Sequence, residues 1–433
     1  MAELIEARAV RKVSRRLLWF LVLLYAFSYL DRINLGFAAL AMNHDLRLTA
    51  TQFGAASTIF YLGYVLCEIP SNLMLARFGA RVWLPRILVT WGIASAATMF
   101  ATGAMSLYSI RTLVGLAEGG FLPGVLLYLT LWFPQAHRAR ANALFMIAQP
   151  LTIALGAPLS GLILDRHSAF GMAAWRWLFL VEGLPSVILG IIAYFYLTDK
   201  PEDAKWLSRD EKDALARSLE PQVRDQPTPW GEILSRPVIL LSIAYFGLIM
   251  TLNTIVTWTP QIVREMIKEH SFSSVGLLTA IPALITAVCM PFWSAHSDRT
   301  RERVWHVAAP LGLAAVGWVF VASFHLADLR MLGLTFCAAG GFTAMSVLWT
   351  VPQGLLSSAA RPAGIAFVSS CGILASMATP LLIGYLHDLT HSFAAGLFFL
   401  AFVLIGAAGL VIAACSMDLN ASKPGPLSPP LHP

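Results

Sequence analysis

The chain has 433 residues, of which 57% are hydrophobic and 12% are charged, and its mean hydropathy is +0.69. Because soluble domains carry about 25% charged residues, this composition excludes a soluble globular protein and predicts a polytopic membrane protein. The formal net charge of +6 comes from basic residues placed beside apolar segments, so a nucleic-acid partner is not expected.

Hydropathy predicts twelve membrane-spanning helices, and the expected fold is therefore an all-α integral membrane protein. The segments lie near 17–38, 53–76, 84–104, 107–132, 141–164, 175–197, 237–260, 274–295, 304–325, 330–357, 363–386 and 392–415. The first segment contains charged residues and no small-residue cleavage pattern, which indicates a retained helix and not a signal peptide.

Basic residues cluster before the first segment and after the second, fourth and eighth segments. By the positive-inside rule, this pattern predicts an even number of spans with both termini in the cytoplasm. We therefore expect a multi-pass protein of the cell inner (plasma) membrane.

The break after the sixth segment is rich in charge and proline and predicts a cytoplasmic linker between two six-helix halves. Within it, Ser208 followed by an acid three residues later is typical of the first turn of a short helix. The predicted parts are a cytoplasmic tail (1–16), an N-terminal half (17–197), the linker (198–236), a C-terminal half (237–416) and a proline-rich disordered tail (417–433).

Two short sequence matches relate the halves to each other. Arg299 follows the eighth span as Arg77 follows the second, 222 residues earlier. Asp388 closes the eleventh span as Asp165 closes the fifth, 223 residues earlier. Two matches at nearly one offset indicate a duplicated six-helix unit, which is an architecture of transporters that rock about a site near the membrane midplane.

Asp31 and Arg32 lie inside the first apolar segment. A charged residue near the middle of a spanning helix costs about 2.5–3.5 kcal/mol on insertion scales, so both must face the protein interior or a watery cavity. Adjacent helical residues point about 100° apart, and each therefore needs its own partner. The pair is either a structural element that fixes helix registry, or a site where the carboxylate takes up a proton and the guanidinium holds an anion.

Arg111 and Glu118 form a second set in the fourth segment, seven residues apart and so on one helix face, about 10 Å apart along the axis. A lone intramembrane Glu can be a satisfied core residue, but two acid–arginine sets on separate spans favour a functional site. Burial disfavours an ionised carboxylate, and a nearby guanidinium favours it. Such an acid can gain or lose its proton according to whether an anionic substrate occupies the arginine, which binds carboxylates bidentately.

Other polar residues within the spans are interhelical hydrogen-bonding groups or substrate ligands. They are Tyr64, Gln149, Tyr245, Asn253, Ser346 and Thr350. Trp258 and Trp349 are predicted either to line an aromatic pocket or to lie at a membrane interface, where tryptophan is common. Trp349 lies well inside its span, which favours the pocket. No HExxH, GxSxG or clustered His/Cys signature occurs, so no enzyme, metal site or cofactor is expected.

The loop after the second span resembles the signature G-x-x-x-D-R-x-G-x-R-R of the major facilitator superfamily. The residues that match are Arg77, Gly79 and Arg81. Asn72 and Ala76 replace the first glycine and the acid, whereas the second copy retains Asp298 and Arg299. The resemblance implies that Arg77, Arg81, Asp298 and Arg299 belong to gating loops at the cytoplasmic ends. It leaves open how the first loop, which lacks the acid, is latched.

The chain further resembles the anion:cation symporter family of that superfamily, most closely its 4-hydroxyphenylacetate permease branch. The most specific stretches are 29–34, 69–72, 117–124, 139–148, 258–261 and 342–345. The resemblance implies that Asp31 and Glu118 are proton-coupling acids and that the anion site includes Arg32, Tyr64, Arg111 and Gln149. Ser369 and Ile373 stand where the family usually has asparagines, so the far side of the pocket is expected to differ.

The predicted function is a monomeric, proton-coupled symporter that imports a small organic anion across the lipid bilayer by alternating access. The expected substrate ligands are Arg32, Tyr64, Arg111, Gln149, Tyr245, Asn253, Ser346, Trp349 and Ser369. An aromatic acid such as 4-hydroxyphenylacetate is favoured over tartrate, phthalate or a sugar acid, because the far wall offers few hydrogen-bonding groups. The alternatives are an efflux antiporter or a membrane nutrient sensor on the same scaffold.

Overall fold

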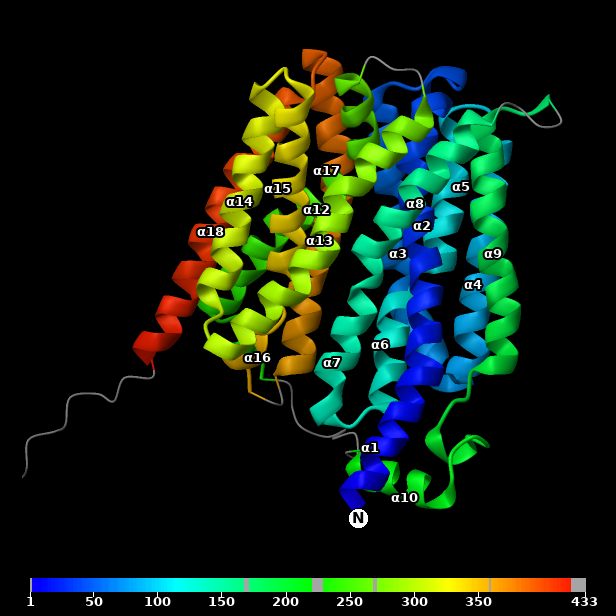
Figure 1. Ribbon diagram of the computed structural model, residues 1–433, viewed down its shortest axis with the longest axis vertical. Coiled ribbons are helices and arrows are strands. Elements are labelled where there is room, and N and C mark those ends of the chain that lie inside the picture. Colours follow the sequence, from blue (N-terminus) through cyan, green and yellow to red (C-terminus); the bar gives the residue numbers. More distant parts are fainter. Residues whose placement is uncertain (1, 167–170, 220–228, 268–270, 358–359, 422–433) are drawn as a thin grey trace, which may run out of the picture.

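The computed structural model describes residues 2–166, 171–219, 229–267, 271–357 and 360–421 (Figure 1). In these parts of the chain, twelve helical spans are long and apolar enough to cross a membrane. The predicted all-α fold of twelve spans in two six-helix halves is confirmed, and the halves stand side by side in Figure 1.

Two of the six spans of the N-terminal half are each built from a pair of helices. The six spans are α2 (Trp19–Asp45), α3 (Ala50–Phe78), α4 (Ala80–Ala96), α5 (Ala104–Glu118) with α6 (Phe121–Trp132), α7 (Gln135–Met146) with α8 (Ala148–Asp165), and α9 (Ala174–Tyr196). The C-terminal half consists of α12 (Arg236–Met266), α13 (Phe272–Thr300), α14 (Val304–Ser323), α15 (Ala327–Leu348) with the short α16 (Val351–Leu355), α17 (Arg361–Thr390) and α18 (Ala394–Ala421).

The ends of two helices differ from the sequence prediction. The first span continues from α1 (Ala2–Val13) through a π-helical turn at Ser14–Leu18, so residues 2–16 of the predicted tail are helical. At the other end of the chain α18 includes residues 417–421 of the predicted disordered tail, and the rest of that tail lies outside the described residues. Backbone hydrogen bonding continues where the apolar run stops, and hydropathy marks only the run.

A pair of glycines breaks the fourth span between α5 and α6. Gly120 has a φ of +89°, and a side chain there would meet the Ser71 hydroxyl of α3 at 2.5 Å. Glycine therefore permits both the left-handed turn and the close approach of α3. The break lies directly after Glu118, so this acid is the last residue of α5.

The linker and the N-terminal helix lie together at one end of the molecule, here called the linker end (Figure 1). The predicted short helix is α10 (Arg209–Ser218), and Ser208 and Glu211 form the capping box that confirms the sequence signal. Lys12 of α1 donates a hydrogen bond to Glu211 at 2.8 Å. Burial by itself raises the pKa of Glu211, but hydrogen bonds from Lys12 and Ser208 outweigh it and hold that pKa below its usual value.

The two halves meet at the opposite end, here called the distal end, where the duplicated acids cap helices of the other half. Asp388 of α17 accepts hydrogen bonds from the N–H groups of Ala50 (3.0 Å) and Thr51 (2.7 Å), at the start of α3. Asp165 of α8 accepts them from Phe272 (2.8 Å) and Ser273 (2.7 Å), at the start of α13. A carboxylate at a helix N-terminus satisfies unpaired N–H groups and complements the helix dipole.

The remaining hydrogen bonds between the halves lie at the distal end or midway along the spans. Arg264 donates to the carbonyl of Leu40 at 2.8 Å, and Thr58 donates to the carbonyl of Met377 at 2.6 Å. Among the described residues, no hydrogen bond or ion pair joins the halves at the linker end. The molecule is therefore closed between its halves at the distal end and not latched at the linker end.

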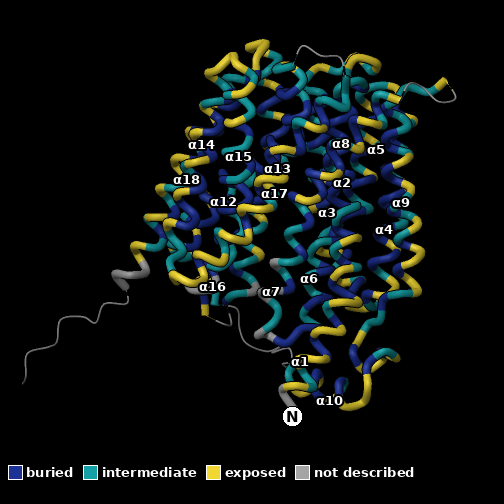
Figure 2. The backbone as a smooth tube through the Cα atoms, viewed as in Figure 1, coloured by how far each residue is buried: buried dark blue, intermediate teal, exposed yellow. Residues whose placement is uncertain are grey.

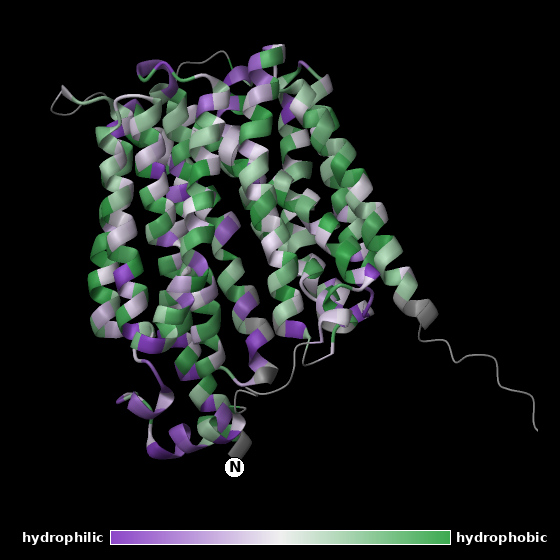
Figure 3. Cartoon of the chain, turned by 180° about the vertical axis from the view of Figure 1, so that it is seen from behind, coloured by the Kyte–Doolittle hydropathy of each residue, from purple (hydrophilic) through white to green (hydrophobic). Residues whose placement is uncertain are grey.

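Exposure and hydropathy follow the demands of a lipid environment. Exposed residues lie along the outer faces of the spans in Figure 2, and they include large apolar side chains such as Phe402 (77% exposed) and Phe195 (75% exposed). Hydrophilic residues gather at the helix ends and around the linker in Figure 3. The acids and arginines inside the N-terminal half are the exceptions that define the candidate site.

Candidate functional site

A buried ion pair joins the first and fourth spans. Arg32 Nη2 donates to Glu118 Oε1 at 2.7 Å, and the two side chains are 20% and 1% exposed. The Ser28 hydroxyl donates to the same oxygen at 3.1 Å, whereas Glu118 Oε2 has no partner among the described residues. The sequence placed Arg111 on the same face as Glu118, but the ion-pair partner comes from the neighbouring helix.

Asp31 lies beside this pair and is held by neutral donors. Asn34 Nδ2 donates to Asp31 Oδ1 at 3.1 Å, and the Ser95 hydroxyl of α4 donates to the same oxygen. Arg111 interacts electrostatically with Asp31, although no ion pair within 4.0 Å joins them. The two acids predicted to couple protons therefore have different environments, one with a bound guanidinium and one without.

Arg111 is buried over an aromatic ring. Its guanidinium carbon lies 4.6 Å from the centroid of Phe60, and its Nε has no hydrogen-bond partner among the described residues. Stacking on the ring holds the planar group in place. An arginine that is positioned in this way, with an unused donor, can receive an anion.

Hydroxyl and amide groups surround Arg32. Its guanidinium carbon lies 5.7 Å from the ring centroids of both Phe60 and Tyr64. Gln149 Nε2 donates to the Tyr25 hydroxyl at 2.6 Å, and Tyr25 interacts electrostatically with Arg32. The structure thus brings Tyr64 and Gln149 into the neighbourhood of Arg32, and their role in anion binding stays a prediction.

Three residues of the C-terminal half belong to the candidate site. The Tyr61 hydroxyl lies 3.4 Å from Oδ1 and 3.3 Å from Nδ2 of Asn253 across the boundary between the halves. Tyr245 is buried and packs edge-on against Trp349, with ring centroids 5.0 Å apart. Tyr245 and Asn253 lie on the same helix, α12, and Tyr245 interacts electrostatically with Tyr25. Asn253, Tyr245 and Trp349 are here called the aromatic wall.

Other predicted ligands of the C-terminal half have partners of their own or lie elsewhere. Ser346 Oγ lies 2.8 Å from Ser294 Oγ and also donates to a backbone carbonyl of its own helix. Ser369 is half-buried on α17. Trp258 is buried against Phe53 and Phe393 where the halves meet at the distal end, here called the distal seam. It therefore does not belong to the wall that contains Trp349.

The gating residues predicted for the first loop are engaged with the linker. The Arg81 backbone N–H donates to Asp199 Oδ1 at 2.8 Å, and its side chain donates to the carbonyl of Tyr194 at 3.1 Å. Asp199 therefore supplies, from the linker, a carboxylate at the start of α4. Arg77 lies over the ring of Phe78, and Asp199 is the acid that contacts this loop, next to Gly79.

The second loop has its own network. Asp298 pairs with Arg303 at 2.8 Å, while Arg299 is exposed. His296 Nδ1 lies 2.7 Å from His306 Nε2, and His306 Nδ1 lies 2.6 Å from Glu302 Oε2. Burial by itself raises the pKa of Glu302, but hydrogen bonds from the Trp305 N–H and from His306 outweigh it and lower that pKa.

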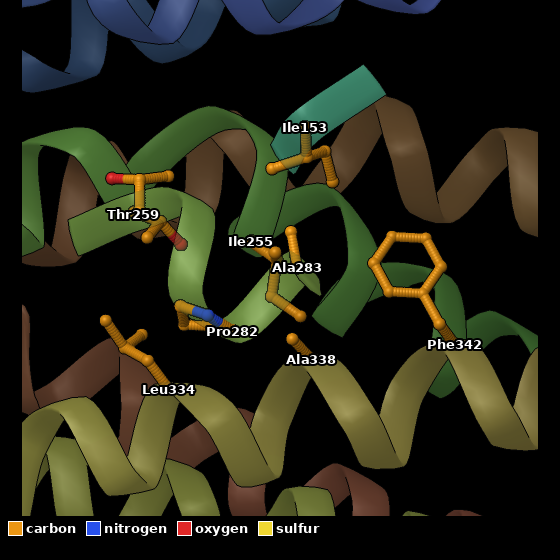
Figure 4. Close-up of a pocket in the computed structure, with 9 residues that line it drawn as sticks. Ile153, Ile255, Thr259, Pro282, Ala283, Leu334, Ala338 and Phe342 are labelled. Atoms are coloured by element: carbon orange, nitrogen blue, oxygen red, sulfur yellow. The ribbon is translucent and has the colours of Figure 1, made fainter. Parts of the chain in front are cut away.

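A small apolar pocket of about 20 Å³ lies at the distal seam (Figure 4). It is lined mainly by apolar side chains from α8, α12, α13 and α15, including Ile153, Ile255 and Phe342. That volume holds about one water molecule, and the pocket contains none of the acids or arginines. No group of three His, Cys, Asp or Glu residues in the described ranges is placed to hold a metal ion.

Sequence reasoning missed several polar residues of the cluster. Tyr25, Ser28 and Asn34 recur with the predicted Asp31 at spacings of three along α2, so helical periodicity applied to polar residues would have found them. Glu182 of α9, which is 2% exposed, was visible as an acid in an apolar span. Its neighbours on other helices could not be read from spacing.

Comparison with known sequences and structures gives one consistent result. The family model of the Major Facilitator Superfamily matches residues 21–360. A protein of Agrobacterium vitis named for tartrate transport is 42% identical over 428 residues, which cover 98% of this chain and 96% of that protein. The Pseudomonas putida protein NicT, named for metabolite transport, is 38% identical and covers 93% of each chain.

The crystal structure of a D-xylose–proton symporter has the same fold, with a TM-score of 0.73 at 15% identity, over 93% of this chain and 96% of that one. The family match spans most of the chain and both curated relatives align over nearly their full lengths. The protein is thus a multi-pass membrane transporter and not an enzyme, and it belongs to the Major Facilitator Superfamily.

Proposed function

We propose that the protein is a proton-coupled symporter that imports a small organic carboxylate. The observation that carries this proposal is the Arg32–Glu118 pair, in which a buried acid occupies the guanidinium that suits a carboxylate substrate. A substrate anion and an ionised Glu118 compete for one cation. Protonation of Glu118 removes the competitor, so uptake of the anion and of a proton are favoured together.

In an alternating-access cycle, the end of the molecule that is closed shows which side of the membrane the site faces. The distal end is closed by the caps of Asp165 and Asp388, and the linker end carries the basic loops that the positive-inside rule assigns to the cytoplasm. The present conformation is therefore the one that faces the cytoplasm, in the inner membrane, with both termini inside. Among the four charged residues of the site, Arg32 is the most exposed, at 20%.

Two classes of carboxylate compete as substrate. The wall of Tyr245 and Trp349 favours an aromatic acid such as 4-hydroxyphenylacetate, because flat apolar surfaces suit a ring. The hydroxyl and amide groups of Tyr25, Tyr61 and Asn253 favour a hydroxylated acid such as tartrate, and the Agrobacterium relative is named for tartrate transport. Both use the same carboxylate-binding arginines.

The test is uptake into proteoliposomes with an imposed pH gradient, acidic outside, and labelled tartrate and 4-hydroxyphenylacetate in parallel. Accumulation above the external concentration, abolished by a protonophore, is the expected result for at least one acid. Equal uptake with and without the gradient for every acid tested refutes proton coupling. Direct competition between the two acids then decides the class.

A further inference from the structure

A third buried acid lies next to the proposed coupling site and has no role in the function proposed above. Glu182 of α9 is 2% exposed. Its Oε1 accepts a hydrogen bond from the Ser160 hydroxyl of α8 at 2.7 Å, and its Oε2 has no partner among the described residues. No lysine or arginine of the described chain lies within ion-pairing distance of it.

Asn34 connects Glu182 to Asp31. The Asn34 amide donates to Asp31 at 3.1 Å and also lies within interaction range of Glu182. Asn34 is one turn nearer the distal end than Asp31, about 4.5 Å along the helix axis. One amide group therefore faces two carboxyl groups, and its Oδ1 has no donor in the described structure.

The charges of this interior do not balance if every group is ionised. Arg32 is paired with Glu118, and Arg111 interacts electrostatically with Asp31. Glu182 is therefore left without a cation. An unpaired carboxylate in a low-dielectric interior costs several kcal/mol, whereas a neutral carboxylic acid that is hydrogen-bonded costs much less. A proton on Glu182 also provides the donor that the unpaired acceptor oxygens lack.

We infer that Glu182 is an additional proton-binding residue of the transport cycle, linked to Asp31 through Asn34. The inference rests on the proposed proton coupling. Two carboxyl groups that interact electrostatically, as Glu182 and Asp31 do, hold a single negative charge more easily than two. In the present conformation the proton resides on Glu182 and the charge on Asp31. Glu182 takes up this proton from outside while the distal end is open. Once the substrate has left through the linker end and water has replaced it, the O–H bond of Glu182 breaks and the proton passes to that water and so to the cytoplasm.

The primary test is the isosteric variant Glu182→Gln, which keeps an acceptor for the Ser160 hydroxyl but cannot release a proton. Substrate exchange without a gradient should continue, because it needs no net proton movement. Accumulation driven by a pH gradient should fall at least tenfold, and the pH profile of uptake should lose one titration. Glu202→Gln, at an exposed linker position, is the matched control and should behave as wild type.

Infrared spectroscopy gives a second readout that does not depend on transport. The carbonyl band of a protonated carboxylic acid, distinct from carboxylate bands, should lose intensity in Glu182→Gln and persist, shifted, in Glu182→Asp. If Glu182→Gln does not fold, the same band in Glu182→Asp and in Ser160→Ala, where the hydroxyl donor is removed, should shift relative to wild type.

The outcomes separate this inference from the proposed function. If wild type accumulates substrate and Glu182→Gln does so with the same magnitude and pH profile, Glu182 is a structural group and the inference is refuted. An unchanged protonated-carboxyl band in every Glu182 variant has the same meaning. If wild type itself shows no gradient-driven accumulation, the proposed symport is refuted first.

Discussion

The competition between Glu118 and the substrate for Arg32 makes a quantitative prediction about binding. Two unit charges about 4 Å apart attract by about 4 kcal/mol at an effective dielectric constant near 20. The Arg32–Glu118 contact of 2.7 Å places the charge centres near this separation. An ionised Glu118 should therefore weaken anion binding by up to about 4 kcal/mol, or nearly a thousandfold.

The perturbation is Glu118→Gln, which keeps an oxygen for Ser28 and Arg32 and removes the charge. In wild type, the substrate Kd should rise about tenfold per pH unit wherever Glu118 is ionised in the free protein, because binding then requires the uptake of one proton. In the variant the Kd should be tight and nearly independent of pH. In the Glu118→Gln variant, no carboxylate competes with the substrate anion for Arg32 at any pH.

Isothermal titration of purified protein across a pH series measures both slopes directly. Glu202→Gln is again the control for a Glu-to-Gln change without contact to the site. A variant that keeps the wild-type slope would show that the titrating group is elsewhere, and Asp31→Asn would be the next candidate. A Kd that is weaker in Glu118→Gln at all pH values would refute the idea that Glu118 competes with the substrate.

Three further predictions address the anion site, the aromatic wall and the second loop. Arg111→Lys keeps the charge but loses the stacked planar fork, so substrate affinity should fall at least tenfold, about 1.4 kcal/mol, in the same titration. Trp349→Ala removes the ring that packs on Tyr245 and should weaken aromatic acids by about 0.5–1.5 kcal/mol, while tartrate competes as before. In Glu302→Gln the lowered pKa of the wild-type carboxyl is lost. That stabilisation is present above the unfolded-state pKa of about 4.3 and disappears as pH falls through the lower folded value. The variant should therefore melt below wild type at neutral pH and at the same temperature in strong acid, and an equal difference at both pH values would contradict the assignment.

The fold was predictable because lipid imposes a strong constraint on composition. Each span needs about 20 apolar residues, so twelve runs in the hydropathy pattern become twelve spans. The helix ends were not predictable in the same way. The extension through Ser14–Leu18 is set by hydrogen bonds within the helix and by the contact of Lys12 with Glu211, neither of which leaves an apolar signal.

The site was predictable in its residue types and not in its pairings. Charged residues inside spans are costly enough that Asp31, Arg32, Arg111 and Glu118 stood out at once. Periodicity correctly placed two of them on one face of the fourth span, but the partner of Glu118 is Arg32. Which helices face each other depends on packing between spans, and no spacing within one span contains that information.

The distal seam shows how a closed end can still open in each cycle. An anion at a helix N-terminus contributes about 0.3–1 kcal/mol when exposed and up to about 2 kcal/mol when partly buried. The caps made by Asp165 and Asp388 are therefore worth a few kcal/mol together, whereas breaking a buried ion pair costs about 3–5 kcal/mol for a single one. Binding of a substrate and a proton can supply the smaller amount. The buried ion pair Arg32–Glu118 lies inside the N-terminal half, so opening of the distal end does not pull it apart. The contacts between the halves are ones that binding energy can break.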